Sequence, residues 1–338
     1  MSTIWDVAKR AGVSIASVSR VINQSPHKVS ETARIRILEA VKELDYRPNA
    51  LAQGLIMKRS MTIGTIIPDI SNPYYAEIVR GIQDVAEEFG YAVVLQNTDR
   101  TKNRIIRCIQ VLREKRADGI IFSGGIIHAY ETLSSLKELT GRVVVIGRHE
   151  VDFPAVRVDN MGGATQAVQH LLELGHERIG FISGPKMSTS SIDRLKGYKN
   201  ALAQNGRHFD AGLVKQGNLT PESGFQAAKE VLGRRERPTA ILASNDLMAF
   251  GAIRAARSLG FRVPQDLSVV GFDNIPLSSY FEPPLTTVEI PMHSVGTASM
   301  QMLADLLSGR EFSRVRLFTT RLLVRESSAK RSGGKKMA

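Results

Sequence analysis

The feature that most constrains the fold of this chain is a regular alternation of short apolar segments with longer amphipathic ones, which begins at Thr62. Segments such as 62–68 and 118–123 are continuous apolar runs, the pattern of strands that are buried on both faces. The stretches between them repeat apolar residues at helical spacing. Strands and helices that alternate in this way form parallel sheets with helices on both faces.

The alternation gives too many strands for one small sheet, and its rhythm breaks near Asp159. We therefore expect two doubly wound lobes, with the chain crossing between them near Asp159, Glu289 and Thr320. The expected strands are 62–68, 91–96, 118–123, 142–147, 178–183, 213–216, 239–243 and 267–272, with a short extended piece at 155–158. The expected helices are 74–90, 102–115, 129–139, 161–174, 191–205, 221–233, 245–259 and 293–308, and a strand after the last of them returns to the first lobe.

The first two dozen residues predict a helix-turn-helix motif. One helix is expected at about 4–10 and a second at about 15–23, with Ser14 as the N-cap of the second. Gly12 lies between them, where a residue without Cβ tolerates a turn with positive φ. The alternative is a small helical hairpin inside a larger core.

The second helix of this motif has two distinct faces. Val18 and Val21 are placed to pack it onto the first helix. Ala16 and Arg20 are four residues apart and share a face, and Val18 lies about 200° from Ala16 around the helix. A helix that presents a small residue and an arginine on its outer face fits the major groove of DNA, where arginine can pair bidentately with guanine.

Two further helical segments follow the motif. Ser30 can cap a helix at about 31–44. Apolar residues keep helical spacing along it, at Ile35, Leu38, Val41 and Leu44. Asn49 can cap a short segment, 50–57, in which Gly54 weakens the helix by roughly 1 kcal/mol relative to alanine. We expect this segment to form a helix only when something packs against it, because isolated helices this short rarely persist in water.

The positive charge of the chain is concentrated at its amino-terminal end. The net charge is +12, and residues 1–59 hold ten basic and five acidic side chains. The tail after Glu326 adds four basic residues and no acid. Basic charge beside a helix-turn-helix suits a polyanionic partner. For the tail, a disordered solvated end is favoured over a second binding site.

The remaining composition argues for a cytoplasmic protein with no metal or cofactor. The chain has one cysteine, Cys108, which excludes an internal disulfide and is expected on the apolar face of a helix. It starts Met-Ser-Thr without a basic and apolar leader, and no apolar run approaches the roughly 18 residues of a membrane span. The seven histidines are scattered, and loop or surface roles suffice for them.

Ordered motifs along nearly the whole length resemble the LacI/GalR family of transcriptional regulators. They are Asp6-Val-Ala, Ala11-Gly-Val-Ser, Val18-Ser-Arg-Val-Ile-Asn23, Tyr46-Arg-Pro-Asn-Ala-Leu-Ala-Gln-Gly-Leu55, Ile67-Pro-Asp-Ile-Ser-Asn-Pro-Tyr-Tyr-Ala76, Leu174-Gly-His176, Ser244-Asn-Asp246, Val270-Gly-Phe-Asp-Asn274 and Pro284-Leu-Thr-Thr287. The resemblance implies an all-α helix-turn-helix head and an α/β core of two parallel-sheet lobes, like type I periplasmic binding proteins. It also implies a homodimeric repressor that binds a palindromic operator in double-stranded DNA and responds to a small-molecule effector, expected to be a sugar or a related metabolite.

The resemblance assigns DNA contacts to the head and the hinge. Ile15, Ala16 and Arg20 match base-reading positions, and Ser17 and Asn23 match positions that touch phosphate. The hinge contributes Asn49, Ala52 and Leu55, of which Leu55 matches the leucine that wedges into the minor groove at the operator centre. An apolar side chain on a conditionally folded helix can open a flexible base step in this way.

The resemblance also assigns an effector site between the lobes. Its matching positions are Tyr74, Gly147, Asp159, Arg194, Leu219, Asn245 and Asp273. Most of these independently fall just past the carboxyl ends of expected strands, where doubly wound sheets bind ligands. Leu219 stands where several members carry an aromatic residue, and Ser188 stands where a purine-binding member has arginine, which argues against a purine. Some members bind a phosphorylated carrier protein through basic residues at the positions of Gln301 and Asp305, so that partner is not expected.

These expectations define the domains. They are a helix-turn-helix DNA-binding domain (1–46), a hinge helix and linker (47–60), a two-lobed core for effector binding and dimerisation (61–327) and a basic, disordered tail (328–338). Lobe 1 is expected at about 61–159 and 291–319, and lobe 2 at about 160–290 and 320–327.

Two other functions are less consistent with the sequence. A transport solute-binding protein would leave the basic head unexplained and lacks an export signal. An enzyme would need a phosphate loop, a nucleophile elbow or metal-ligand spacing, none of which occurs.

Overall fold

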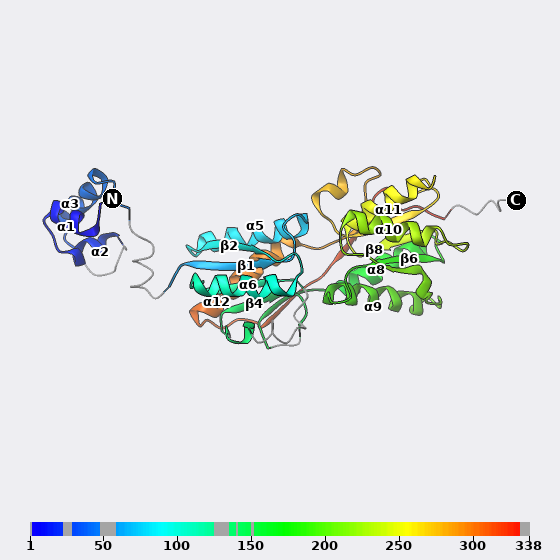
Figure 1. Ribbon diagram of the computed structural model, residues 1–338, viewed down its shortest axis with the longest axis horizontal. Helices are drawn as coiled ribbons and strands as arrows, with labels where there is room; N and C mark the ends of the chain where they lie inside the picture. Colours follow the sequence, from blue (N-terminus) through cyan, green and yellow to red (C-terminus); the bar gives the residue numbers. More distant parts are fainter. Residues whose placement is uncertain are drawn as a thin grey trace. The chain divides into compact units, whose positions relative to one another are not determined.

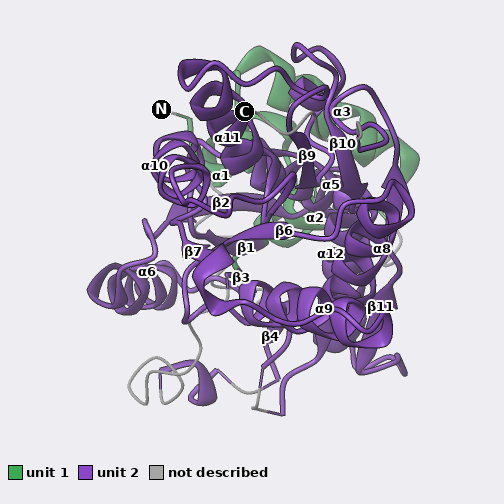
Figure 2. Ribbon diagram, turned by 90° about the vertical axis from the view of Figure 1, so that its right-hand side faces the viewer, with its two compact units in different colours: residues 1–61 green, residues 62–338 purple. Residues whose placement is uncertain are grey.

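The computed structural model describes residues 2–22, 29–47, 59–124, 135–139, 141–149 and 152–331. Contacts divide the chain into two units, residues 1–61 and 62–338, which Figure 2 colours separately. The helix expected at 50–57 and most of the one at 129–139 lie outside the described residues, as do Asn23, Asn49, Ala52 and Leu55.

Unit 1 contains the three helices expected before the hinge: α1 (Ile4–Ala11), α2 (Ile15–Ile22) and α3 (Glu31–Glu43). Gly12 ends α1 in the left-handed region at φ 62°, which confirms the expected turn. The Ser14 hydroxyl accepts a hydrogen bond from the Ser17 backbone N–H at 3.2 Å, and Ser30 caps α3 by accepting from Ala33. Local polar residues therefore determine where α2 and α3 begin.

The core of unit 1 differs from the expected one in α3. The buried residues of the unit are Val7, Ala8, Ala11, Val18, Ala33, Ile37 and Ala40. Ile35 and Leu38, whose spacing suggested the core face, are each 51% exposed. The face of α3 that meets α1 and α2 carries Ala33, Ile37 and Ala40, with Val41 and Leu44 packed against it as expected, and Ile35 and Leu38 lie outside that face.

Unit 2 contains two six-stranded sheets, each of which forms one lobe (Figure 1). Lobe 1 has β1 (Thr62–Ile67), β2 (Ala92–Asn97), β3 (Gly119–Ser123), β4 (Val143–Ile146), β5 (Ala155–Val158) and β11 (Val315–Phe318), in the order β11-β5-β4-β3-β1-β2. Lobe 2 has β6 (Ile179–Ser183), β7 (Val214–Gln216), β8 (Ala240–Ala243), β9 (Ser268–Asp273), β10 (Thr286–Glu289) and β12 (Arg321–Leu323), in the order β12-β10-β9-β8-β6-β7.

Most strand pairs are parallel, which confirms the doubly wound class. Two strands of lobe 2, β10 and β12, were not expected, and β12 pairs antiparallel with β10 through Val288 and Leu322, so this sheet is mixed. The extended piece at 155–158 is a full strand of lobe 1, paired with both β4 and β11. Short strands such as β12 have too little sequence for alternation to be recognised.

Helices cover both faces of each sheet. Lobe 1 carries α5 (Pro73–Glu88), α6 (Lys102–Glu114) and α12 (Met292–Ser308). Lobe 2 carries α8 (Asn160–Glu173), α9 (Thr189–Gln204), α10 (Pro221–Leu232) and α11 (Asp246–Ser258), with 3₁₀ helices η1 (Ala211–Leu213) and η2 (Pro276–Ser279). In Figure 1, α5 and α6 lie on opposite sides of β1 and β2. Cys108 of α6 is buried in the apolar layer beneath this sheet, as expected.

Glycine permits the close crossing of α5 and α12. A Cβ on Gly81 would lie 2.2 Å from the backbone oxygen of His293. A Cβ on Gly296 would lie 2.1 Å from the backbone oxygen of Ile78. Only glycine fits at these two positions without moving one helix away from the other.

The expected start of the disordered tail is wrong. His149 and His176 lie in loops, as expected, but both are buried, and His176 hydrogen-bonds to Thr239 Oγ1 at 2.9 Å and to the Ala329 carbonyl at 3.0 Å. The tail does not separate at residue 328, because the Arg331 backbone N–H donates to the Leu174 carbonyl at 2.8 Å. The chain therefore stays attached to lobe 2 through Arg331, the last described residue.

Candidate functional site

The outer face of α2 is the candidate DNA-contacting surface of unit 1. Ala16 and Arg20 are exposed, whereas Val18 is fully buried, so the two faces expected of this helix are present. Ile15 is partly buried against the core and presents only part of its side chain outward. The Ser17 hydroxyl lies 3.0 Å from the Ser14 hydroxyl, so it is partly engaged in the cap.

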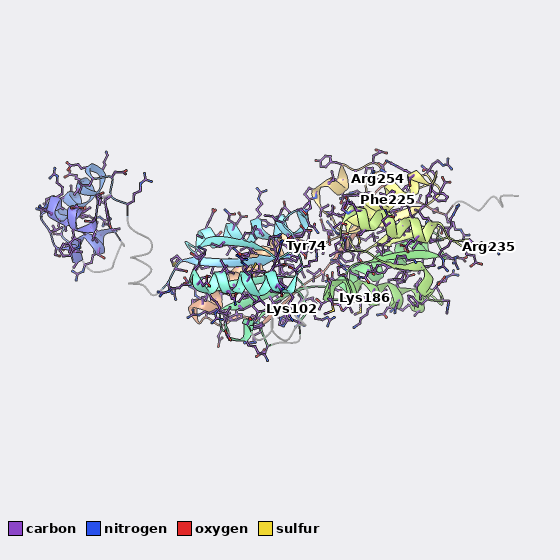
Figure 3. All side chains as sticks on the ribbon, in the orientation of Figure 1. Tyr74, Lys102, Lys186, Phe225, Arg235 and Arg254 are labelled. Carbon is purple, nitrogen blue, oxygen red and sulfur yellow. The ribbon has the colours of Figure 1, made fainter. Side chains whose placement is uncertain are left out.

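A cleft of about 870 Å³, open to solvent, lies between the two lobes of unit 2. Six of the seven expected effector residues line it: Tyr74, Gly147, Arg194, Leu219, Asn245 and Asp273. Figure 3 labels Tyr74 on the side of lobe 1 that adjoins lobe 2.

Asp159 does not line the cleft. It is the N-cap of α8, and its Oδ1 accepts a hydrogen bond from the Gly162 backbone N–H at 2.8 Å. Its neighbour Asn160 lines the cleft instead. The expected position is therefore wrong by one residue. The Asp159 carboxylate points toward the free N–H groups at the start of α8 and not toward the cleft.

Arg194 joins three elements of lobe 2 in the cleft wall. Its Nε donates to Asn160 Oδ1 at 2.8 Å, its Nη1 donates to the Ser244 carbonyl, and its Nη2 lies 3.2 Å from Asp273 Oδ1. The guanidinium also stacks over the Phe272 ring, 3.8 Å from the ring centroid. This planar, five-donor group thus fixes the ends of β8 and β9 relative to the start of α8.

Asp273 is the buried acid of the cleft. Only 4% of it is exposed, and burial raises its pKa to about 7, with the nearby Asp246 adding to the rise and Arg194 opposing it. Its Oδ1 accepts no well-aligned hydrogen bond within the described part of the chain. A ligand hydroxyl is the kind of donor that would satisfy this oxygen.

The backbone at Asp273 is held in an unusual conformation. Asp273 and Asn274 have φ values of 111° and 58°, a region that side chains rarely adopt. The Asn274 side chain donates to Glu289 and accepts from Arg325, and the Ile275 N–H donates to the buried Asp246 at 2.9 Å. These flanking hydrogen bonds keep the Asp273 carboxylate directed at the cleft.

Helix starts supply much of the remaining wall. Asn72 and Asn245 are the N-caps of α5 and α11, and both line the cleft. Asn245 donates its amide N–H to the Leu219 carbonyl at 3.1 Å. Burial raises the pKa of the Tyr75 hydroxyl to about 12, and it raises the pKa of the Tyr74 hydroxyl still more. Both hydroxyls therefore stay protonated at neutral pH. The wall offers amides, hydroxyls and one ion pair, which suits a polyhydroxylated molecule.

Sequence reasoning missed several residues that line the cleft: Asn72, Tyr75, Arg100, Asn160 and Thr189. Arg100 follows β2, and the rule that ligands bind past the carboxyl ends of strands would have included it. Asn160 follows β5, so the same rule would have included it. For Asn72, Tyr75 and Thr189 no local signal distinguishes a residue that faces the cleft from its neighbour.

The described residues contain no group of three or more histidine, cysteine, aspartate or glutamate side chains arranged to hold a metal. Within the same residues, every helix is too short or too polar to cross a bilayer.

A helix-turn-helix unit joined to a two-lobed ligand-binding fold defines a DNA-binding regulator with a ligand-binding core. Comparison with known families agrees. Residues 3–49 match the bacterial regulatory proteins of the lacI family, and residues 60–326 match the periplasmic binding proteins and sugar binding domain of the LacI family. The chain belongs to the LacI family. It is a transcriptional regulator that binds DNA, and its relatives are regulators rather than enzymes.

Individual relatives match over most of their length. Catabolite control protein A of Priestia megaterium is 39% identical, over 90% of this chain and 92% of the relative. The lac repressor dimer bound to operator and the anti-inducer ONPF is 31% identical, with a TM-score of 0.88, covering 97% of this chain and 99% of that one. A transcriptional regulator CelR–cellobiose complex is 34% identical, with a TM-score of 0.74. The match covers 97% of this chain and 100% of that chain.

Proposed function

We propose that the protein is an effector-controlled repressor that binds a palindromic operator as a homodimer and takes a sugar or sugar derivative in the interlobe cleft. One observation carries this proposal: polar and charged side chains of both lobes line a single cleft in a chain that also bears a helix-turn-helix unit. Relatives support it, since the lac repressor structure contains operator and the CelR structure contains cellobiose. A protein that acts on chromosomal DNA works in the bacterial cytoplasm.

The proposed DNA contacts keep the roles that the sequence suggested. Arg20 and Ala16 read base edges, with Ile15 contributing the part of its side chain that faces outward. Ser17 and Asn23 contact phosphate, and Asn49, Ala52 and Leu55 act in the hinge.

The proposed effector contacts are those of the cleft wall. Asp273, Arg194 and Asn245 bind hydroxyl groups from lobe 2, and Tyr74 and Gly147 face them from lobe 1. Leu219 supplies apolar contact, and Asn160 takes the role expected of Asp159.

Exposed apolar residues support the homodimer. On lobe 2, Tyr280 is 85% exposed and Leu277 of η2 is 50% exposed, and both side chains are of the type that is buried at protein interfaces. The phosphorylated carrier protein is not carried over as a partner, since Gln301 and Asp305 hydrogen-bond to each other at 3.1 Å and Asp305 would repel a phosphate.

The test combines DNA binding with a ligand screen. Operator sequences selected from random DNA should be palindromic and should bind the parent protein but not the Arg20→Ala variant. Sugars and sugar derivatives are then screened by thermal shift, where a ligand at 100 times its dissociation constant adds about 2.7 kcal/mol of stability. Binders should alter operator affinity in a band-shift assay. Selected sites without symmetry, or binders that leave operator affinity unchanged, would contradict the proposal.

A further inference from the structure

Three charged residues among the described lining residues face the cleft, and they differ in how well they are satisfied. Arg194 and Asp273 belong to lobe 2 and form an ion pair. Arg194 also donates to Asn160 Oδ1 and to the Ser244 carbonyl, so each of its three nitrogens already has a partner in lobe 2. Arg100 is the one contributed by lobe 1, and it is not fully paired.

Of the two terminal nitrogens of Arg100, one pairs with a carboxylate and the other does not. Its Nη1 lies 3.3 Å from Asp69 Oδ2, and both side chains are about one fifth exposed. The Tyr75 hydroxyl also interacts with this guanidinium, and Nη2 is buried without a well-aligned hydrogen bond within the described structure. An unpaired guanidinium N–H that is removed from water is unfavourable, and an anionic oxygen is the group that best satisfies it.

The backbone holds Arg100 in place at the end of β2. Asp99 and Arg100 both lie in the left-handed region, with φ values of 46° and 59°, and the following residue, Thr101, starts α6 without a side-chain cap. Two consecutive non-glycine residues with positive φ are uncommon and carry a conformational cost. This turn places a positive side chain in the wall of the cleft.

Other elements of the two lobes also bring positive potential to the cleft. The N-caps of α5 in lobe 1 and α11 in lobe 2, Asn72 and Asn245, both line the cleft, so the positive ends of the two helix dipoles lie at it from opposite sides. Figure 3 places Lys102, at the start of α6, and Lys186, before α9, at the facing ends of the two lobes. Both lysines are exposed, so they add positive potential at the edges of the cleft.

We propose that the effector carries an anionic group, a carboxylate or a phosphate, that binds Arg100 on lobe 1 while its hydroxyls bind Asp273 and Asn245 on lobe 2. The effector class is therefore a sugar acid or a sugar phosphate rather than a neutral sugar. This inference rests on the proposed effector function and narrows its ligand class.

The test measures binding of matched compounds to the full-length protein by thermal shift and calorimetry. The panel pairs neutral hexoses and pentoses (glucose, galactose, mannose, fructose and ribose) with their aldonic or uronic acids and with their phosphate esters. At least one acid or ester should bind between roughly tenfold and a hundredfold more tightly than its neutral parent, the range expected for a hydrogen bond to a charged group. Carboxylates and phosphate esters form separate arms, and the arm that binds identifies the anion.

Two variants test the role of Arg100 with opposite expected signs. Arg100→Gln should remove the preference for the anion, whereas Asp69→Asn should tighten anion binding, because it removes the negative charge that competes for the same guanidinium. If the ion pair only stabilises the fold, both variants should weaken binding together. Arg104→Gln is the matched control, since Arg104 lies on α6, pairs with Asp99 and is more than half exposed.

The outcomes separate the inference from the function on which it rests. Neutral sugars that bind as tightly as their acids and esters, or an Arg100→Gln variant that keeps the anion preference, would overturn the inference and leave the effector function standing. A panel in which no compound binds the parent protein would overturn both.

Discussion

Replacing Asp273 with asparagine should separate the stability of the protein from its ability to bind effector. The carboxyl group is 4% exposed, and burial is the largest cause of a pKa raised from 3.8 to about 7. A carboxyl that binds its proton more tightly in the folded chain than in the unfolded chain favours folding at low pH. Stability falls as the pH rises from about 4 to about 7, and this contribution is constant above that interval.

The magnitude follows from the width of that interval. Each unit of difference in pKa corresponds to about 1.4 kcal/mol, so an interval of roughly three units amounts to about 4 kcal/mol in the fully ionised state. At pH 5 the folded parent keeps its proton while the unfolded chain has already ionised, so Asp273→Asn should be more stable than the parent by only about 2 kcal/mol. At pH 8 the variant should be more stable by up to about 4 kcal/mol, because it never ionises.

Urea unfolding followed by far-ultraviolet circular dichroism at pH 5 and pH 8 measures this difference. The same variant should bind the effector more weakly, because the amide offers one acceptor oxygen where the carboxylate offers two and carries no charge. Operator affinity without effector should stay nearly unchanged. A variant that is several kcal/mol less stable than the parent at pH 8 would refute the reasoning and make the pair with Arg194 a structural one.

Three further predictions concern the DNA-contacting surface, the hinge and the core. Arg20→Ala should cost roughly 1–3 kcal/mol of operator affinity and relax preference at one guanine per half-site, whereas an equal loss on all DNA would mean that Arg20 touches phosphate. Leu55→Ala should weaken specific operator binding and reduce DNA bending, with little change in non-specific affinity, and an unchanged bend angle would exclude its role as a wedge. Gly296→Ala should destabilise lobe 1 by roughly 1–3 kcal/mol or more in urea unfolding, since the new Cβ would lie 2.1 Å from the Ile78 carbonyl oxygen.

The sequence predicted the long elements of the fold because their apolar periodicity is strong. The apolar run 62–68 became β1, and the helix expected at 102–115 became α6. Prediction failed where few residues carry the pattern. β12 is three residues long and pairs antiparallel with β10. Its position therefore depends on a distant partner, since Leu322 pairs with Val288, 34 residues earlier in the sequence.

The periodicity of α3 misled for a different reason. Ile35 and Leu38 keep helical spacing, yet each is 51% exposed. The contact with α1 and α2 is made through Ala33, Ile37 and Ala40, and of the expected residues only Val41 and Leu44 pack against it. Spacing identifies a face of a helix, but the size of the opposing surface determines which face is buried.

The cleft residues were predictable where a strand end determines their position and not where a cap intervenes. Asn245 and Asp273 lie at the carboxyl ends of β8 and β9, and both line the cleft. Asp159 also follows a strand, but its carboxylate caps α8 and leaves Asn160 in the wall. A capping aspartate and a ligand-binding aspartate look the same in sequence, since both are acids placed before a helix.

The contacts of the cleft also indicate how a ligand would act on the two lobes. Arg194 already ties α8, β8 and β9 together, so the lobe 2 wall is assembled before any ligand arrives. On lobe 1, Arg100 is left with a buried, unpaired nitrogen. A ligand that satisfies Arg100 and Asp273 together gains its affinity only when the two walls are at the correct spacing. Its binding free energy therefore favours one arrangement of the lobes over the others, which is the condition for an effector to change DNA affinity from a distance.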